Sequence, residues 1–490
     1  MKAASCLFFA QLAPALAATL LVGCASVTAV QLPSINPSAA LESYQAHVGD
    51  EPALSEAQTP VRWWELFNDT TLSAIESELG QSLDIQTATL RVEESRAQLG
   101  LADAPRYPTL ALAGGYSRSA ISENSPTHRL GAPTSGQDMW SLGLQAGWEL
   151  DLWGHLSHTK ASAQSRVDAA YYGRDAVLTA VSADVARSYL LLRGVQAQAS
   201  LVEKNLQIGR DLIRMAESRE RNGAATRFDA ASARADAAGL EARLTQLNHR
   251  RHTLMNTLAL LLGKPPRELD ERLTFADLPS MPSRLPIGVP SELARKRPDI
   301  LQAEARLRAA VADIDAAKAD FYPRIGLTGA LGAQAFDLSD LGIWGSRHYS
   351  IGPTLYLPIF EGGRLSSQLA LSETRHRLAG IAYQQVVLRA WHEVNNALGA
   401  YASERKRHDQ LQRALKQSEI ALGVAQRSYQ EGSADFTAVL VARRSLLANQ
   451  AELSDCATAS ALAVVSLYRA LGGGWSAQWL GETTTNGASS

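Results

Sequence analysis

Cysteine is almost absent from this sequence of 490 residues, which contains only Cys6, Cys24 and Cys456. Cys6 and Cys24 lie near the start, where Lys2 precedes an apolar stretch typical of a secretory signal. The mature exported chain is therefore expected to keep Cys456 alone and to form no internal disulfide framework. Cys456 lies in a helical pattern, so we expect a small core residue rather than a reactive thiol.

The apolar stretch ends in Leu21-Val22-Gly23-Cys24, which resembles the lipobox of bacterial lipoproteins. The resemblance implies that Cys24 carries a covalent lipid and becomes the mature N-terminus. Ala25 follows, where an Asp would favour retention in the inner membrane, so we expect the outer membrane. The alternative is a plain signal with an incidental cysteine.

The sequence also lacks a charge imbalance and long apolar runs. The formal net charge is −2 with 20% charged residues, which leaves no basic surface of the kind that nucleic-acid binding requires. After the signal, no apolar run reaches the roughly 18 residues that a membrane-spanning helix needs. If the chain crosses a bilayer, it must do so with strands.

Proline is missing from two long windows, residues 134–264 and 359–490, which are rich in Ala, Leu, Arg, Glu and Gln. In the first window we expect a helix over about residues 155–219, which at roughly 1.5 Å per residue is about 100 Å long. The windows break at Gly223 and Gly432, because glycine suits a left-handed turn. A second helix then returns, so each window predicts an antiparallel coiled coil.

The glycines also reveal an internal duplication. Each of three glycine pairs is 209 positions apart: Gly154 and Gly363, Gly223 and Gly432, and Gly263 and Gly472 (363 − 154, 432 − 223 and 472 − 263). Each copy predicts one unit: a strand hairpin, a long helix, a tight tip and a returning helix.

Apolar and polar residues alternate before each window. From Trp140 to Leu152 every even position is apolar, and residues 109–117 form a weaker partner strand. Residues 325–334 and 349–359 alternate in the second copy, so the chain supplies four strands. A soluble antiparallel sheet would show the same pattern, but Trp and Tyr near the strand ends favour a membrane barrel. Four strands cannot enclose a lumen, whereas a trimer would supply about 12.

No constellation for catalysis or metal binding is present. His155 with His158, and His249 with His252, have a spacing that puts two imidazoles on one helix face. Neither pair has a nearby carboxylate or cysteine set, so we expect solvated surface histidines. The sequence contains no nucleophile elbow, zinc-protease motif or phosphate loop. We expect neither an enzyme nor a cofactor beyond the lipid on Cys24.

Four segments together resemble the outer membrane factors of tripartite efflux systems, in particular the TolC- and OprM-like, NodT-type lipoproteins. The segments are Trp63-Trp64-Glu65-Leu66-Phe67, residues 148–156, Gly362-Gly363-Arg364-Leu365, and the stretch from Arg297-Pro298-Asp299-Ile300 to Phe321-Tyr322-Pro323. The resemblance covers nearly the whole mature chain. It implies a homotrimer with a 12-stranded outer-membrane barrel and a periplasmic barrel of long helices.

The resemblance also implies partners and a function. Substrate would pass from an inner-membrane pump, commonly of the resistance-nodulation-division (RND) type, and a periplasmic adaptor through a passive, gated conduit to the exterior. The coiled-coil tips would close the periplasmic end and meet the adaptor, which points to Gly223, Thr226, Asp229, Gly432, Asp435 and Phe436. Three copies of Asp435 could form a gating ring of carboxylates; a helix N-cap is an equally good interpretation.

The expected fold class is α+β, with a small mixed equatorial region between barrel and coiled coils. Two other functions stay open: the exit duct of a type I protein secretion system, and a lipid-anchored coiled-coil scaffold without a pore. The expected segments are the signal 1–23, a tether 24–62, a first repeat 63–264 (hairpin 108–153, coiled coil 155–262), a connection 265–298, a second repeat 299–472 (hairpin 323–361, coiled coil 363–471) and a tail 473–490.

Overall fold

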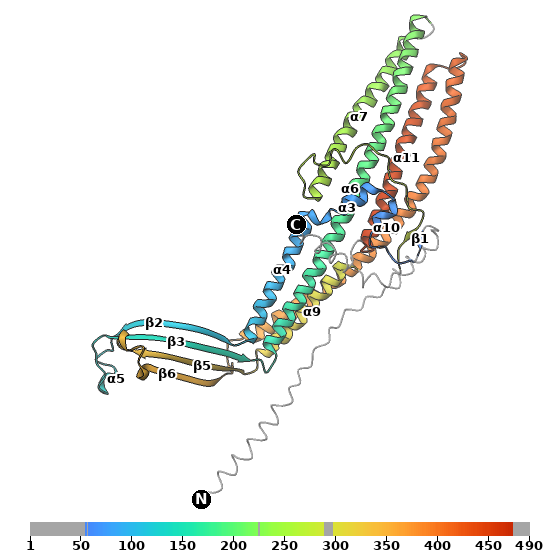
Figure 1. Cartoon of the computed structure of the whole chain (residues 1–490). Helices are drawn as coiled ribbons and strands as arrows, with labels where there is room; N and C mark the ends of the chain where they lie inside the picture. Colours follow the sequence, from blue (N-terminus) through green and yellow to red (C-terminus); the bar gives the residue numbers. More distant parts are fainter. Residues whose placement is uncertain (1–53, 56, 224–225, 289–296, 474–490) are drawn as a thin grey trace. The chain divides into compact units, whose positions relative to one another are not determined.

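The structure is a computed structural model that describes residues 54–55, 57–223, 226–288 and 297–473. The expected signal 1–23, the lipid site Cys24, most of the tether and nearly all of the tail lie outside the described residues. The chain divides into two compact units. Among the described residues, the first contains 93–169 and 304–382, and the second contains 54–55, 57–92, 170–223, 226–288, 297–303 and 383–473. Long helices and one main sheet make the fold α+β, as predicted (Figure 1).

Four antiparallel strands form the sheet of the first unit, in the order β2-β3-β5-β6. A loop with the short helix α5 (Pro126–Arg129) joins β2 to β3, and a loop with two 3-10 helices, η5 (Leu338–Asp340) and η6 (Trp344–Ser346), joins β5 to β6. β3 pairs with β5, so the two predicted hairpins share one sheet (Figure 1). Among the described residues, β2 and β6 each have one partner strand and are therefore the edges. The strands are β2 (Thr109–Ser119), β3 (Gln137–Leu150), β5 (Arg324–Ala335) and β6 (Arg347–Tyr356).

The register places apolar side chains of all four strands on one face. Leu144 pairs with Leu112 on one side and Leu331 on the other, and Leu331 pairs with Tyr349. The opposite face carries small and polar residues; for example, Gln145 lies between Ala111 and Ala330. The alternation in the sequence therefore produces a sheet with one apolar and one polar face.

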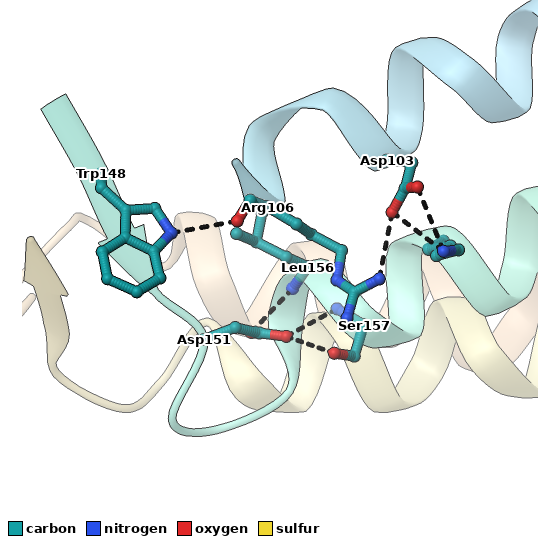
Figure 2. A network of polar contacts seen from close by, with 7 residues as sticks. Asp103, Arg106, Trp148, Asp151, Leu156 and Ser157 are labelled. Atoms are coloured by element: carbon teal, nitrogen blue, oxygen red, sulfur yellow. Dashed lines mark hydrogen bonds and ion pairs between the residues drawn. The ribbon is translucent and has the colours of Figure 1, made fainter. Parts of the chain in front are cut away.

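Two of the predicted strands end earlier than their alternation. β3 stops at Leu150 rather than Leu152, because Asp151 turns to cap α6 (His155–Arg221). Its carboxylate accepts hydrogen bonds from the backbone N–H groups of Leu156 at 3.0 Å and Ser157 at 2.7 Å (Figure 2). β6 stops at Tyr356 rather than Ile359, because Tyr356 pairs with Arg324, the first residue of the partner strand β5.

A polar network fixes β3 to the helices around it (Figure 2). The indole N–H of Trp148 donates to the carbonyl of Arg106 at 3.0 Å, in η3 (Ala104–Arg106) at the end of α4 (Leu83–Asp103). Asp103 binds both Arg106 and Lys160 at 3.1 Å, so α4 is also tied to the start of α6.

The long helices repeat in length as well as in order. α6 and α10 (Arg364–Gln430) each have 67 residues, and α7 (Arg227–Leu261) and α11 (Phe436–Ala470) each have 35. α9 (Pro298–Ala319) precedes β5 as α4 precedes β2. The predicted duplication would produce these equal lengths.

The main hydrophobic core of the second unit packs three short elements against the long helices: η1 (Trp63–Phe67), α3 (Thr70–Glu76) and η2 (Leu79–Gln81). Trp63 is 1% exposed, and its ring stacks on Tyr468 of α11 with a centroid distance of 5.5 Å. Trp64 is buried as well, and so is Cys456, which confirms the predicted core position of this cysteine. In the proline-rich connection, β4 (Leu285–Pro286) pairs in parallel with β1 (Leu54–Ser55).

The prediction of solvated histidines is wrong for His155. Its Nδ1 lies 2.9 Å from the carboxylate of Asp320, because the start of α6 packs beside the end of α9. His249 and His252 are exposed on α7, as predicted.

Candidate functional site at the helical tips

The first tip joins α6 to α7. Gly223 has φ +70°, a left-handed conformation that other residues rarely adopt. Thr226 is the N-cap of α7, and the Asp229 carboxylate accepts a hydrogen bond from the Thr226 backbone N–H at 3.3 Å. The Asp229 carboxylate is therefore bound to the backbone at the start of its own helix.

The second tip joins α10 to α11 with a different arrangement. Gly432 has φ +75°, and the backbone N–H groups of Ser433 and Ala434 donate to the Ser428 carbonyl at 2.9 and 3.2 Å. Asp435 takes the N-cap position of α11, but its exposed carboxylate accepts no capping hydrogen bond from the described residues of this helix. Among the described residues, Asp435 therefore has the position of an N-cap but not its hydrogen bond, and its carboxylate stays free at the start of α11.

A hydrophobic cluster holds the two helical hairpins together behind these turns. Phe436 of α11 is 2% exposed, and the ring of Tyr429 of α10 lies 5.3 Å from it between centroids. The Arg219 guanidinium of α6 lies over the same tyrosine ring, 4.2 Å from its centroid. We call this group the tip cluster; its buried members are Leu212, Ala216, Ala230, Ala233, Tyr429, Phe436, Val439 and Leu440.

The hydroxyl of Tyr429 is buried and has no hydrogen-bond partner among the described residues. An unpaired buried hydroxyl opposes the packing that the rest of the ring favours. The tip cluster is therefore stabilised by apolar contact and by the Arg219 cation rather than by the tyrosine hydroxyl.

Two neighbouring arginines of α11 reach from the second hairpin to the first. Arg443 is 7% exposed and donates to the backbone carbonyl of Asn205 in α6 at 2.7 Å. Burial disfavours its positive charge and lowers the pKa of Arg443. Arg444 forms an ion pair with Asp236 of α7, with Nη2 2.6 Å from Oδ1.

The first hairpin also has an ion pair of its own, between Arg234 of α7 and Glu217 of α6 at 2.6 Å.

The sequence identified the turns and missed the contacts between the hairpins. Phe436 is the one residue of the predicted set that lies in the tip cluster, and the others stay at the turns. Tyr429, Arg219 and Arg444 were not singled out, because aromatic and charged residues occur along these helices without a local signal for their partners.

At the tips, apolar, cation–π and ion-pair contacts join the two helical hairpins. Within the described ranges, no group of three or more His, Cys, Asp or Glu side chains could hold a metal ion. The described helices also include none with the length and hydropathy to cross a membrane.

Comparison with known proteins gives one consistent family. A model of the outer membrane efflux protein family matches residues 74–264 and 289–473. The chain is 34% identical over 416 residues to the outer membrane protein OprJ of Pseudomonas aeruginosa, which covers 84% of this chain and 86% of OprJ. It is 33% identical over 422 residues to the cation efflux system protein CusC of Escherichia coli, covering 84% and 88%.

Solved structures agree with the sequence relatives. The outer-membrane channel OprN superimposes with a TM-score of 0.83 at 28% identity, covering 92% of this chain and 98% of OprN. The Campylobacter jejuni CmeC outer membrane channel shares the fold with a TM-score of 0.85 at 22% identity, covering 94% and 99%.

Proposed function

Because the chain belongs to the outer membrane efflux protein family, we propose that three copies form the gated exit duct of a tripartite pump. The protein lies in the outer membrane and serves as an exit channel for efflux. The trimer, the barrel, the gate and the particular partners are the proposed part.

The unpaired edge strands of the sheet support the proposal of a trimeric barrel. In lipid, an open edge leaves backbone N–H and C=O groups without partners, and each such group costs several kcal/mol. β2 and β6 are the two edges, so pairing β6 of one chain with β2 of the next would satisfy both. Three copies of four strands would close a barrel of about 12 strands, within the range for outer-membrane proteins.

The apolar face has the dimensions of a membrane band. Trp140 and Trp148 lie on this face of β3, eight positions apart, which at about 3.4 Å per residue is roughly 27 Å along the strand. At the usual strand tilt of about 35–45°, this corresponds to roughly 20 Å along the membrane normal. Outer-membrane barrels carry an apolar band of about 25 Å between aromatic girdles. The two tryptophans would mark the two girdles.

The polar face would line a wide duct with little chemical preference. Glycine, alanine, serine and threonine dominate this face, for example Gly143, Ser141 and Thr328. Relatives of similar sequence identity are named for different exported compounds: OpmQ of Pseudomonas putida for pyoverdine export, and TtgI of the same species for toluene efflux. Export of small toxic compounds is the function that this lining supports best.

The tips would close the periplasmic end and contact the adaptor of an RND-type pump. In a trimer, Asp435 would be present three times, and its side chain has no capping bond to hold it at the helix. Converging carboxylates repel one another or bind a cation, which would make the opening sensitive to charge. Asp229 is already bound to its own helix start and is less suited to this role.

Cys24 would carry a fatty acyl chain such as palmitate and add a lipid anchor to the barrel. Metabolic labelling with palmitate should mark the wild type and not Cys24→Ser. Because the proposed barrel would hold the protein in the membrane by itself, Cys24→Ser should still fractionate with the outer membrane.

Conductance of the purified full chain in a planar bilayer tests the proposal. We expect an SDS-sensitive trimer that forms discrete conducting channels, and deletion of the gene should make cells hypersensitive to small toxic compounds. A soluble periplasmic monomer, or a lipid-anchored protein without conductance, would contradict the duct and favour a scaffold. Loss of protein export without drug accumulation would instead indicate a type I secretion duct.

A further inference from the structure

Three charged side chains interrupt the apolar face of the sheet, and all three lie at its loop end. They are Arg118 near the end of β2, Asp138 near the start of β3 and Arg347 at the start of β6. Every other position of this face within the four strands is apolar, aromatic or glycine. Charge on a lipid-facing surface is tolerated near an interface and disfavoured at mid-depth, so these residues mark one boundary of the apolar band.

Arg347 has no carboxylate within ion-pair distance in the part of the chain that the structure describes. Its Nε donates to the Trp344 carbonyl at 3.1 Å, and its guanidinium lies directly over the Trp344 ring. Trp344 itself is 84% exposed. The result is a cation held on an exposed indole, with donor groups left for a ligand.

At the other edge of the sheet, Arg118 is only partly neutralised. The carboxylate of Asp138 accepts a hydrogen bond from the Tyr116 hydroxyl at 2.8 Å, and Arg118 approaches it at a longer 3.5 Å. The Arg118 side chain is 65% exposed. Tyr116 also packs on Trp140 with ring centroids 4.4 Å apart, so an aromatic pair lies beneath this cation too.

In the trimer of the proposed function, on which this inference rests, β6 of one chain would pair with β2 of the next. Arg347 and Arg118 of the partner subunit would then lie at the same end and on the same face of each seam. β2 contains neither Asp nor Glu, so the neighbouring strand supplies no carboxylate to Arg347. Among the strand residues on this face, each seam would carry two arginines for one carboxylate, and this excess favours an anionic ligand.

We propose that each seam binds a phosphate group of a glycolipid in the outer leaflet, between Arg347 of one chain and Arg118 of the partner subunit. The planar guanidinium matches phosphate oxygens with two parallel hydrogen bonds, which suits arginine rather than lysine. Trp140, two residues further along the apolar face of β3 than Asp138, would contact the acyl-chain boundary below the headgroup, where aromatic residues concentrate. The site needs both chains and would exist three times in the trimer.

Native mass spectrometry of the delipidated full-length trimer tests this site. The probes are diphosphorylated lipid A, its monophosphorylated form, phosphatidylglycerol and inorganic phosphate as a competitor. The variants are Arg347→Gln and Arg118→Gln, with Arg324→Gln as a matched control. Arg324 is an arginine of the same sheet that lies on the polar face and binds Asp320 at 2.6 Å.

The wild type should bind up to three molecules of diphosphorylated lipid A and fewer of the monophosphorylated form. Loss of one charged hydrogen-bonding group should weaken binding about tenfold in Arg347→Gln and in Arg118→Gln, and Arg324→Gln should bind as the wild type. Equal binding by all variants, or an equal loss in the control, would overturn the inference. Equal binding of phosphatidylglycerol, or displacement by millimolar phosphate, would overturn the assignment to a glycolipid.

Trimer formation and conductance separate this inference from the proposed function. If all variants are conducting trimers with unchanged lipid binding, the lipid site alone is wrong. If Arg347→Gln destabilises the trimer without changing lipid binding, Arg347 pairs across the seam with a carboxylate and the inference fails. A wild type that is neither trimeric nor conducting would remove the proposed function as well.

Discussion

Arg444 of α11 binds Asp236 of α7 through two points, with Nη2 2.6 Å from Oδ1 and Nε 3.3 Å from Oδ2. The pair joins the second helical hairpin to the first, close to the tip cluster. It lies at the surface, with the Arg444 side chain 61% exposed, so it contributes only about 0.2–1 kcal/mol to folding. The pair connects the two hairpins, which would separate in the proposed opening of the tips.

Breaking this link should favour the open duct without unfolding the protein. We expect Arg444→Gln to raise the open probability or mean conductance in planar bilayers several-fold, and to leave the thermal midpoint within about 2 °C of the wild type. Exchanging the charges, as Arg444→Asp with Asp236→Arg, should restore part of the closed behaviour.

Glu217→Gln is the matched control, because it breaks the Arg234 ion pair within the first hairpin. That pair has a similar distance and exposure but does not connect the two hairpins. If Glu217→Gln opens the duct as much as Arg444→Gln does, general loosening of the tips explains the result and the link has no special role.

Removal of the Phe436 ring should destabilise the tip cluster. Phe436 is 2% exposed and contacts Tyr429, so truncation to alanine leaves a cavity and costs about 3–5 kcal/mol locally. Faster hydrogen exchange at residues 425–440 and a larger conductance should follow. Phe228 follows the first tip but is 63% exposed, and Phe228→Ala should change neither measurement. Equal effects of the two variants would contradict the role of the cluster.

The strands and the tips could be predicted from the sequence because their signals are local. Alternation along thirteen residues from Trp140 fixes which side chains share a face, whatever the partner strand is. Gly223 and Gly432 mark turns because a positive φ is a property of the residue itself. The end of β3 was missed by two residues, since Asp151 could serve either as a strand position or as a helix cap.

Contacts between the hairpins could not be predicted in this way. Arg219 and Tyr429 meet although they are far apart in the chain, and no periodicity relates them. The uncommitted carboxylate of Asp435 was equally hidden, because its sequence context suits an N-cap as well as that of Thr226 does. The direction of the Asp435 side chain, which leaves it without a capping hydrogen bond, is known only from the structure.

The stability of the protein should fall with rising pH through one buried carboxyl group. Glu76 is fully buried in the second unit; burial raises its pKa well above 4.5, and the hydrogen bond from Ser182 at 2.9 Å offsets this only in part. The folded state therefore keeps a proton that the unfolded chain loses above about 4.5, so this stabilisation is complete at lower pH and is lost as pH rises toward the raised pKa. Glu76→Gln should raise the thermal midpoint at pH 8 by roughly a few degrees and leave it nearly unchanged at pH 4.

Glu78 gives the opposite sign and serves as the control. Burial opposes its charge, but the hydrogen bonds from Lys264 at 2.6 Å and from Arg272 at 2.7 Å outweigh it and lower the pKa of Glu78. Its stabilisation is present above its ordinary pKa and is lost as pH falls through the lowered value. Glu78→Gln should therefore lower the midpoint at pH 8 and have little effect at acid pH. Parallel pH profiles for the two variants would contradict the assignment.

The two tip aspartates should separate gating from helix capping. Asp229→Asn replaces the carboxylate that accepts a hydrogen bond from the Thr226 N–H with a neutral amide. It should destabilise the first turn of α7 by about 0.5–1 kcal/mol and increase local hydrogen exchange. Asp435→Asn removes a charge that makes no capping bond, so exchange at the start of α11 should stay near the wild-type rate. If three Asp435 carboxylates face one another at the closed end, Asp435→Asn should abolish the effect of millimolar divalent cations on conductance, while Asp229→Asn keeps it. A divalent-cation effect that survives in Asp435→Asn would show that the charge-sensitive part of the duct lies elsewhere.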